Sequence, residues 1–154
     1  MKRKVLFICS HNSARSQMAE AFLNLDHGER FEAHSAGVYP GSLLPEVVQA
    51  MSEIGIDISG HGVKSVEEFY RRNVPVDYAI TVCIQAAEVC PPIPANVDVI
   101  NWGFDDPSAQ KTPEERLEVA RRVRGEIRDA IAAWVKDLKE PPEAEKKKKR
   151  FGLF

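Results

Sequence analysis

The sequence predicts an α/β fold, a single domain in which a four-stranded parallel sheet is flanked by helices in the doubly wound manner. Apolar runs of strand length alternate along the chain with segments whose apolar residues recur at helical spacing. This order implies right-handed crossovers between parallel strands. The chain has 154 residues, 44% of them hydrophobic and 29% charged, which suits one soluble domain with an adequate core.

The first half of the chain predicts two strands and two helices in alternation. Its opening strand is continuously apolar after Lys4, as expected for a strand buried on both faces of a parallel sheet. The first helix carries Met18, Phe22 and Leu25 on one face, and the second ends at Gly55. In order, the elements are a strand over residues 4–9, a helix over 16–25, a strand over 31–36 and a helix over 45–54.

The second half predicts strands over residues 78–83 and 97–102, with a short helical candidate over 84–89 and a proline-rich break between them. The last helix is the clearest element. Thr112 is a suitable N-cap, proline follows at the first helical position, and Glu115 completes a capping box. The apolar residues of this helix form one stripe, Ala120, Val123, Ile127, Ile131, Trp134 and Leu138.

The formal net charge of −2 is unevenly distributed. Residues 141–154 carry five basic side chains, Lys146 to Arg150, against two glutamates, a net charge of +3 that leaves −5 for the rest. We therefore expect residues 1–140 to form the folded domain and 141–154 to be a basic, disordered tail. The acidic body gives no support to nucleic-acid binding.

No apolar run approaches the roughly 20 residues that span a bilayer, and the N-terminal apolar segment turns polar by Ser10. We therefore expect a cytoplasmic protein without a membrane partner. Three cysteines do not suggest a disulfide framework, and thiols in a reducing compartment are more often catalytic, metal-binding or buried. The four histidines show no zinc-ligand spacing with the cysteines, so no metal site is predicted.

The loop between the first strand and the first helix has the composition of an oxyanion site. Its residues are Cys9, Ser10, His11, Asn12, Ser13, Ala14, Arg15 and Ser16. Backbone N–H groups and the positive end of a helix attract an oxyanion, and the Arg15 guanidinium binds two of its oxygens. The same field favours a nucleophilic thiolate at Cys9, to which Ser16 donates, and Asn12 tolerates a left-handed backbone. The alternative is a buried strand-end cysteine and a surface arginine.

An oxygen leaving group needs a proton donor, and two aspartates lie in the loop after the fourth predicted strand. We favour Asp106 as the general acid, because Pro107 restricts its backbone to extended conformations. Asp105 is the reserve choice. A turn or N-cap role for either aspartate is the alternative.

Cys83 ends the third predicted strand as Cys9 ends the first. Neighbouring strands are about 4.8 Å apart, so the two thiols would share the carboxyl edge of the sheet if these strands meet at the switch point. A continuous helix would hold Cys83 and Cys90 about 10.5 Å apart, beyond the roughly 7 Å limit for a disulfide. Pairing them therefore requires local unwinding. Alternatively, both are small core residues.

A third thiol also has a chemical use. One cysteine and an acid suffice to hydrolyse a phosphoester. Reduction of arsenic(V) to arsenic(III) needs two electrons, which two thiols supply by forming a disulfide. The extra cysteines therefore favour reduction over hydrolysis.

Several motifs together resemble the thioredoxin-coupled arsenate reductases, which share the low-molecular-weight protein tyrosine phosphatase fold. The resemblance covers about residues 3–138 and rests on the oxyanion loop, the two later cysteines and three short motifs. These motifs are Ser35-Ala36-Gly37, Gly55-Ile56-Asp57-Ile58-Ser59 and Trp102-Gly103-Phe104-Asp105-Asp106-Pro107.

By this resemblance, Cys9 attacks arsenate, Arg15 stabilises the charge and Asp106 protonates the departing hydroxide. Cys83 then attacks Cys9 and releases arsenite. Cys90 attacks Cys83, which leaves a disulfide between these two residues for thioredoxin to reduce. Glutaredoxin or a low-molecular-weight thiol would meet the same dithiol, so the identity of the reductant stays open. No tightly bound cofactor is implied.

Some members of this family bind potassium near the loop, through residues that match Asn12, Glu20 and Ser35. The aspartate that belongs to their site has no clear counterpart near Lys64 and Ser65. This chain therefore has three of the four side chains that bind potassium in those family members and lacks the fourth, the aspartate.

Two other functions are compatible with these residues. His11 and Ala14 replace the glycine and cysteine that familiar reductases often carry, and Ser108 stands where tyrosine phosphatases usually carry an aromatic ring. A low-molecular-weight phosphatase that hydrolyses phosphomonoesters would leave Cys83 and Cys90 structural. A non-catalytic redox sensor would bind an oxyanion or a partner and signal through their disulfide.

Overall fold

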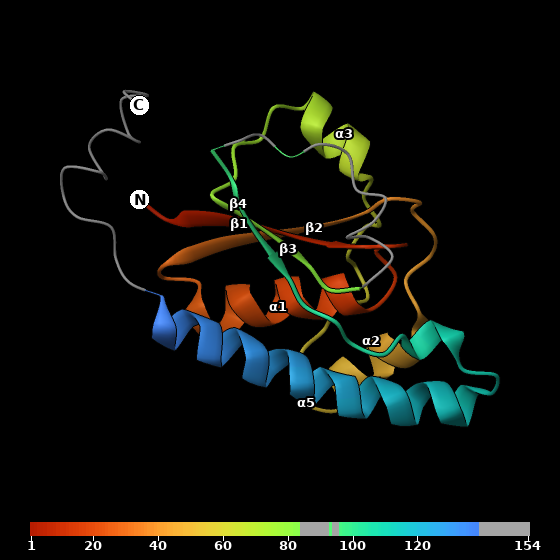
Figure 1. The fold of residues 1–154 in the computed structure, drawn as a ribbon. Helices are drawn as coiled ribbons and strands as arrows, with labels where there is room; N and C mark the ends of the chain where they lie inside the picture. The colour runs from red at the N-terminus through yellow and green to blue at the C-terminus, as the bar shows by residue number, and fades with distance from the viewer. Residues whose placement is uncertain (84–92, 94–95, 139–154) are drawn as a thin grey trace.

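The computed structural model describes residues 1–83, 93 and 96–138. Four strands form one sheet in the order β2-β1-β3-β4, and all neighbouring strands are parallel (Figure 1). The strands are β1 (Arg3–Cys9), β2 (Phe31–Gly37), β3 (Tyr78–Thr81) and β4 (Asp98–Asn101). The predicted α/β fold with a four-stranded parallel sheet is confirmed.

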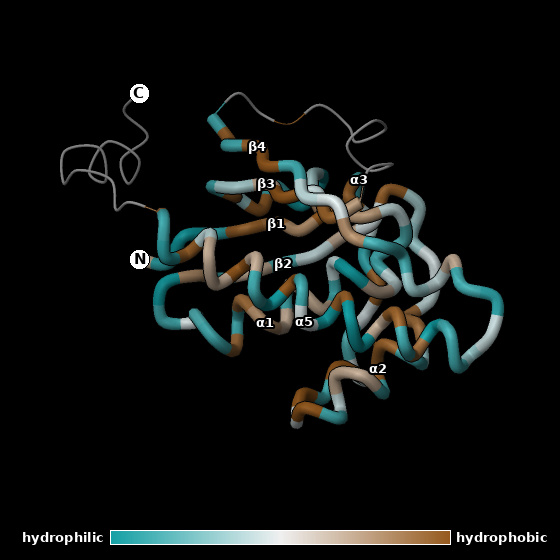
Figure 2. Tube along the Cα trace, turned by 60° about the horizontal axis from the view of Figure 1, so that its bottom comes forward, coloured by the Kyte–Doolittle hydropathy of each residue, from teal (hydrophilic) through white to brown (hydrophobic). Residues whose placement is uncertain are grey.

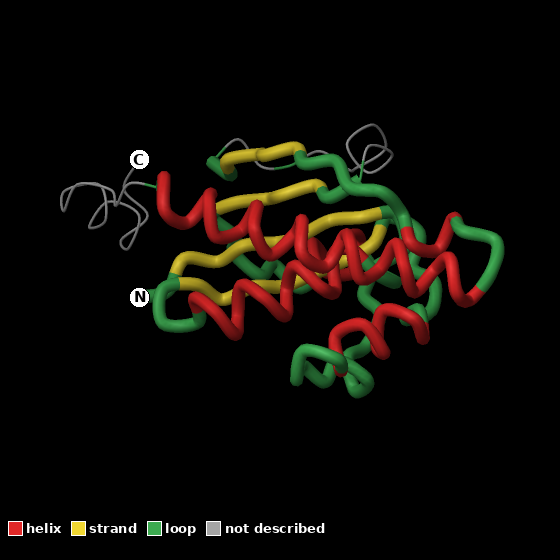
Figure 3. The backbone as a smooth tube through the Cα atoms, turned by 90° about the horizontal axis from the view of Figure 1, so that it is seen from below, coloured by secondary structure: helices red, strands yellow, loops and turns green. Residues whose placement is uncertain are grey.

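Helices flank both faces of this sheet. α1, α2 and α5 lie on one side, and the short α3 lies on the other (Figure 1). Figure 3, which views the molecule from below, shows long helices in front of the strands. The helices are α1 (Arg15–His27), α2 (Pro45–Ser52), α3 (Val66–Arg71), the 3-10 helix η1 (Pro107–Ala109) and α5 (Pro113–Asp137). None of the helices in the described ranges combines the length and the apolar character needed to cross a membrane.

The strand order reverses at β1, because the chain adds β2 on one side of β1 and β3 and β4 on the other. β1 pairs with β2 on one side, where Cys9 is in register with Gly37, and with β3 on the other, where Ile8 is in register with Thr81. In open parallel sheets, ligands bind outside the carboxyl ends of the strands at such a switch point. The loop that follows β1 lies at this point.

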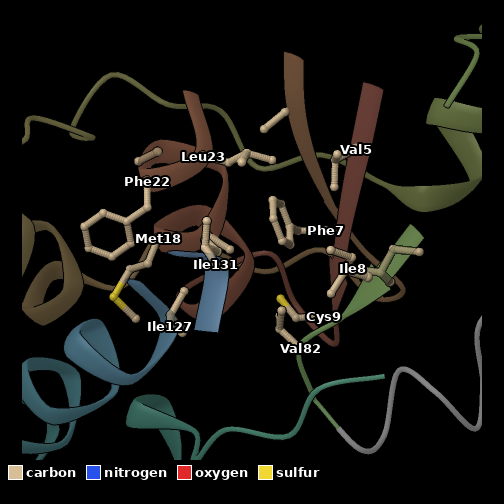
Figure 4. Packing of buried hydrophobic residues seen from close by; sticks show 14 of the residues in the cluster. Val5, Phe7, Ile8, Cys9, Met18, Phe22, Leu23, Val82, Ile127 and Ile131 are labelled. Carbon is tan, nitrogen blue, oxygen red and sulfur yellow. The ribbon is translucent and has the colours of Figure 1, made fainter. Parts of the chain in front are cut away.

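The core holds β1 and α1 in place. Figure 4 shows Met18 and Phe22 of α1 beside Ile127 of α5, with Cys9 near Val82 at the margin of the same buried cluster. In Figure 2, α1 and α5 alternate between hydrophilic and hydrophobic residues along their length. Burial of the apolar faces therefore fixes α1, whose first turn completes the loop after β1.

Most predicted elements are found close to their expected bounds. Neither α3 nor η1 is predicted, because six and three residues are too short for a periodic pattern to stand out. The N-cap of α5 is confirmed, since Thr112 Oγ1 accepts a hydrogen bond from Glu115 N at 3.1 Å. The helical candidate over residues 84–89 and the tail over 141–154 lie outside the described residues.

The prediction that Met18, Phe22 and Leu25 share the buried face of α1 is wrong at Leu25. Leu25 is 62% exposed, whereas Leu23 is fully buried together with Met18 and Phe22. α1 packs against both β2 and α5. Its buried surface is therefore wider than a single stripe and includes Leu23, while the last position of the predicted stripe reaches solvent.

An ion pair between the end of α2 and α5 makes the stability of the fold depend on pH. Arg121 Nε donates to Glu53 Oε1 at 2.9 Å, and Arg124 NH1 lies 3.1 Å from the same oxygen. The bond from Arg121, followed by that from Arg124, lowers the pKa of Glu53 from its ordinary 4.5 to about 2. A carboxyl group with a lowered pKa stabilises the fold above its ordinary pKa, and this contribution is lost as the pH falls towards the folded value.

We therefore expect Glu53→Gln to lower the melting temperature at about pH 7 and to have a smaller effect at about pH 3. Thermal unfolding of the parent and the variant at both pH values measures the difference. An equal effect at the two pH values would contradict this linkage.

Candidate active site

The loop predicted to bind an oxyanion connects β1 to α1 at the carboxyl edge of the sheet. It passes closely over the end of β2. A Cβ atom on Gly37 would lie 2.7 Å from the backbone nitrogen of Asn12 and 2.7 Å from the carbonyl carbon of His11, so only glycine permits this approach. Asn12 has a φ of 54°, the left-handed conformation expected for the pivot of the loop.

The buried side chain of Asn12 joins the loop to two other segments. Its Nδ2 donates to Ser16 Oγ at 2.8 Å, and its Oδ1 accepts from Gln17 Nε2 at 3.0 Å and from Lys64 N at 2.9 Å. The loop is therefore fixed both by the first turns of α1 and by the segment that precedes α3.

The residues after β2 hold the loop from its outer side. Four of their backbone N–H groups donate to loop carbonyls: Val38 to Cys9, Tyr39 to Ser10, Gly41 to His11 and Leu44 to Ser13. The ring nitrogen Nδ1 of His11 also lies 2.8 Å from Tyr39 O. Backbone bonds of this kind leave no signal in side-chain patterns, so the sequence does not identify this segment.

Cys9 Sγ lies at the base of the loop, and the residue is 1% exposed. Asn12 N donates to this sulfur at 3.1 Å, and Ser16 Oγ lies 2.8 Å from it. Because Asn12 Nδ2 already donates to Ser16 Oγ, the hydroxyl proton of Ser16 is directed to the sulfur. Among the described residues, no side chain caps the start of α1, so its positive end also faces the loop. This arrangement suits a thiolate.

Arg15 is the first residue of α1 and lines the same pocket as Cys9. Its NH1 donates to Phe104 O at 3.0 Å, and its NH2 lies 3.3 Å from Asp106 Oδ2. Within the described ranges, its buried Nε has no hydrogen-bond partner and is available to an anion. The pocket is lined by Cys9, His11, Ser13, Ala14, Arg15, Asp106 and Ser108.

The pocket is small, with an empty volume of about 180 Å³. A larger surface depression, with an empty volume of about 1020 Å³, lies elsewhere among Lys2 and residues 24–32, and none of the described residues that line it is a cysteine. Chemistry rather than size therefore identifies the site. In the described part of the chain, no group of three or more histidine, cysteine or acidic side chains is placed to hold a metal ion.

The two candidate acids point to different partners. Asp105 pairs with Arg122 of α5 at 2.7 Å. Asp106 lines the pocket, and its Oδ1 accepts hydrogen bonds from Ser108 N at 2.9 Å and from Ser108 Oγ at 2.7 Å. Asp106 therefore uses Oδ1 in the local turn that the sequence offered as the alternative role, while its Oδ2 faces Arg15.

Cys83 is buried beside the loop. Its sulfur lies 3.4 Å from Ser10 Oγ, and Val82 N donates to Ile8 O, which brings the end of β3 against the end of β1. Cys9 and Cys83 are both free thiols. The sequence assigns Ser10 only to the oxyanion loop and misses its contact with Cys83. Cys90 lies outside the described residues.

Comparison with known proteins agrees with this geometry. Residues 4–144 match the family model of low molecular weight phosphotyrosine protein phosphatases, so the chain belongs to this family. Relatives include the arsenate reductase of Halalkalibacterium halodurans, 40% identical over 134 residues, which are 86% of this chain and 95% of the relative. The arsenate reductase of Bacillus subtilis is 41% identical over 129 residues, 82% of this chain and 91% of the relative. The chain is therefore an enzyme of this family.

Solved structures include both branches of the family. An arsenate reductase in its oxidized state has a TM-score of 0.74 at 30% identity and covers 89% of this chain and 99% of its own. The thioredoxin-dependent arsenate reductase of Corynebacterium glutamicum has a TM-score of 0.65 at 30% identity, with coverage of 89% and 64%. A low molecular weight protein tyrosine phosphatase from T. tengcongensis has a TM-score of 0.72 at 25% identity, with coverage of 89% and 100%.

Proposed function

We propose that this enzyme reduces arsenate to arsenite through a relay of three cysteines. The observation that carries the proposal is the second thiol at the site. Cys83 is buried next to the oxyanion loop, and its sulfur lies 3.4 Å from Ser10 Oγ. Ser10 directly follows the proposed nucleophile, Cys9. Hydrolysis of a phosphoester has no use for the Cys83 thiol. The arsenate reductases at about 40% identity support the same choice.

The first step forms a bond between Cys9 Sγ and arsenic. The thiolate attacks arsenate held by the loop N–H groups and by the Nε of Arg15. One arsenic–oxygen bond breaks, and protonated Asp106 donates its proton so that the oxygen leaves as water. The product is an arsenic(V) adduct on Cys9.

The second step transfers two electrons to arsenic. Cys83, as a thiolate, attacks Cys9 Sγ, a disulfide forms between the two sulfurs, and the sulfur–arsenic electron pair stays with arsenic, which leaves as arsenite. Cys90 then attacks Cys83 and releases Cys9 as a thiolate. Reduction of the disulfide between Cys83 and Cys90 by thioredoxin completes the cycle, which suits a reducing compartment such as the cytoplasm.

Asp106 and Asp105 offer a matched pair of variants for the proposed proton transfer. We expect Asp106→Asn to lower kcat for arsenate by about 100-fold or more, because the amide cannot donate the proton. Asp105→Asn should keep kcat within about threefold, since Asp105 pairs with exposed Arg122 away from the pocket. Steady-state rates of both variants test the assignment, and similar losses in the two would contradict it.

Arsenate-dependent oxidation of NADPH in the presence of thioredoxin and thioredoxin reductase tests the function as a whole. The proposal expects oxidation only when enzyme and arsenate are both present, with arsenite as the product. Replacing thioredoxin with glutaredoxin and glutathione distinguishes the two reductants. If neither system supports arsenite formation, the enzyme is not an arsenate reductase.

A phosphatase activity is the second candidate, because the same loop, nucleophile and acid suffice to hydrolyse a phosphomonoester. The structural similarity to a protein tyrosine phosphatase at 25% identity supports this capacity. Ser108 lines the pocket and gives a phosphotyrosine ring no aromatic partner. Hydrolysis of p-nitrophenyl phosphate without any arsenate reduction would favour the phosphatase.

A further inference from the structure

A partly buried ion cluster, formed by Glu20, His61 and Lys64, lies behind the oxyanion loop. Glu20, one turn beyond Ser16 on α1, has a side chain that is only 12% exposed. Lys64 Nζ lies 3.6 Å from its Oε1, and His61 Nδ1 lies 3.7 Å from its Oε2. Lys64 Nζ also donates to Gly62 O at 3.1 Å. A carboxylate this far from solvent needs a positive partner, and the Lys64 ammonium is that partner.

The residues that would hold a potassium ion do not fit one in this chain. Asn12 Oδ1 already accepts two hydrogen bonds, from Gln17 Nε2 and Lys64 N, which use both of its lone pairs. The ammonium of Lys64 stands at the carboxylate of Glu20, where a second cation would be repelled. Of the other two expected ligands, Ser35 has a buried Oγ without a hydrogen-bond partner in the described ranges, while the Glu20 carboxylate faces Lys64 and His61.

We propose that the Lys64 ammonium takes the place of the potassium ion that some family members bind, and that it positions the oxyanion loop without any metal ion. This inference concerns the loop of the proposed function and rests on it for the identity of the substrate, a tetrahedral oxyanion.

The contacts trace how the ammonium reaches the loop. Lys64 joins Glu20 of α1 to Gly62 O, and Gly62 O also accepts from Gln17 Nε2 at 3.0 Å. The same Gln17 nitrogen lies 3.2 Å from Asn12 O and 3.0 Å from Asn12 Oδ1. The ammonium thus clamps the segment before α3 onto α1, and the clamped segment holds Asn12 in its left-handed conformation. Lys64 is a positioning residue and does not line the pocket.

Binding of inorganic phosphate, measured by calorimetry, tests the clamp without any redox step. The parent should bind phosphate equally well in potassium chloride and in tetramethylammonium chloride at matched ionic strength. Lys64→Met should weaken phosphate binding about fivefold in tetramethylammonium chloride, and Lys64→Arg should restore it. Lys136→Met, which removes an exposed lysine of α5, controls for the loss of one positive charge.

Lys64→Asp supplies the matching gain of function. This variant should bind phosphate weakly in tetramethylammonium chloride and more tightly in potassium chloride, with a parallel rise in melting temperature. A potassium-specific gain in the parent would overturn the proposal, as would parent-like phosphate affinity in Lys64→Met. Because phosphate binding requires no arsenate turnover, a failure here is distinct from a failure of the proposed reduction.

Discussion

Replacing Cys9 by serine is expected to lower arsenate turnover by at least about a thousandfold, the scale seen when a nucleophile is removed from a catalytic unit. A hydroxyl in the same place is a far weaker nucleophile, and it cannot form the disulfide that carries two electrons to arsenic. Steady-state arsenite production in the thioredoxin system measures the loss. Hydrolysis of p-nitrophenyl phosphate should fall in parallel, since both reactions begin with attack by the same sulfur.

The control for Cys9→Ser is phosphate binding. Serine differs from cysteine in a single atom, an oxygen in place of the sulfur. Asn12 N donates to this sulfur, but Asn12 also bonds to Ser16 and Gln17, and these bonds do not involve the sulfur. We therefore expect phosphate to bind the variant within about tenfold of the parent. Arsenite production at the parent rate would exclude Cys9 as the nucleophile.

Replacing Cys83 by serine is expected to separate the two activities of the site. Multiple turnover of arsenate should be lost, again by about a thousandfold or more, because no second thiol is next to the adduct on Cys9 to release arsenite. Hydrolysis of p-nitrophenyl phosphate should remain within about threefold of the parent, since Cys83 contacts Ser10 and does not line the pocket.

Cys90→Ser provides the matched comparison for Cys83→Ser. A single turnover should still release arsenite from the Cys90 variant, whose reaction would stop at a disulfide between Cys9 and Cys83. Full arsenate turnover in Cys83→Ser would contradict the relay. Equal loss of phosphatase and reductase activities in that variant would instead assign Cys83 a structural role.

The sequence predicts the position of the loop well because the loop is one contiguous segment. Cys9 and Arg15 lie at the end of an apolar strand and at the start of a helix, and these boundaries are marked by composition alone. The left-handed conformation of Asn12 is also predictable, since few other residue types tolerate it and the loop itself contains no glycine.

Contacts between distant segments are less predictable. The carboxyl edge shared by Cys9 and Cys83 follows from the strand order, but the contact of Cys83 with Ser10 depends on register. The exact approach of Gly37 to Asn12 depends on how β2 ends beneath the loop. The cluster of Glu20 and Lys64 joins residues 44 positions apart, with no periodic pattern to pair them.

The most direct test of the relay is to map the disulfide after one turnover without reductant. Reduced enzyme is mixed with arsenate, free thiols are alkylated, and peptides are identified by mass spectrometry while arsenite is quantified. The relay predicts one arsenite per enzyme, a disulfide between Cys83 and Cys90, and an alkylated Cys9. Arsenite released while all three thiols remain free, or a disulfide that retains Cys9 as the end product, would contradict it.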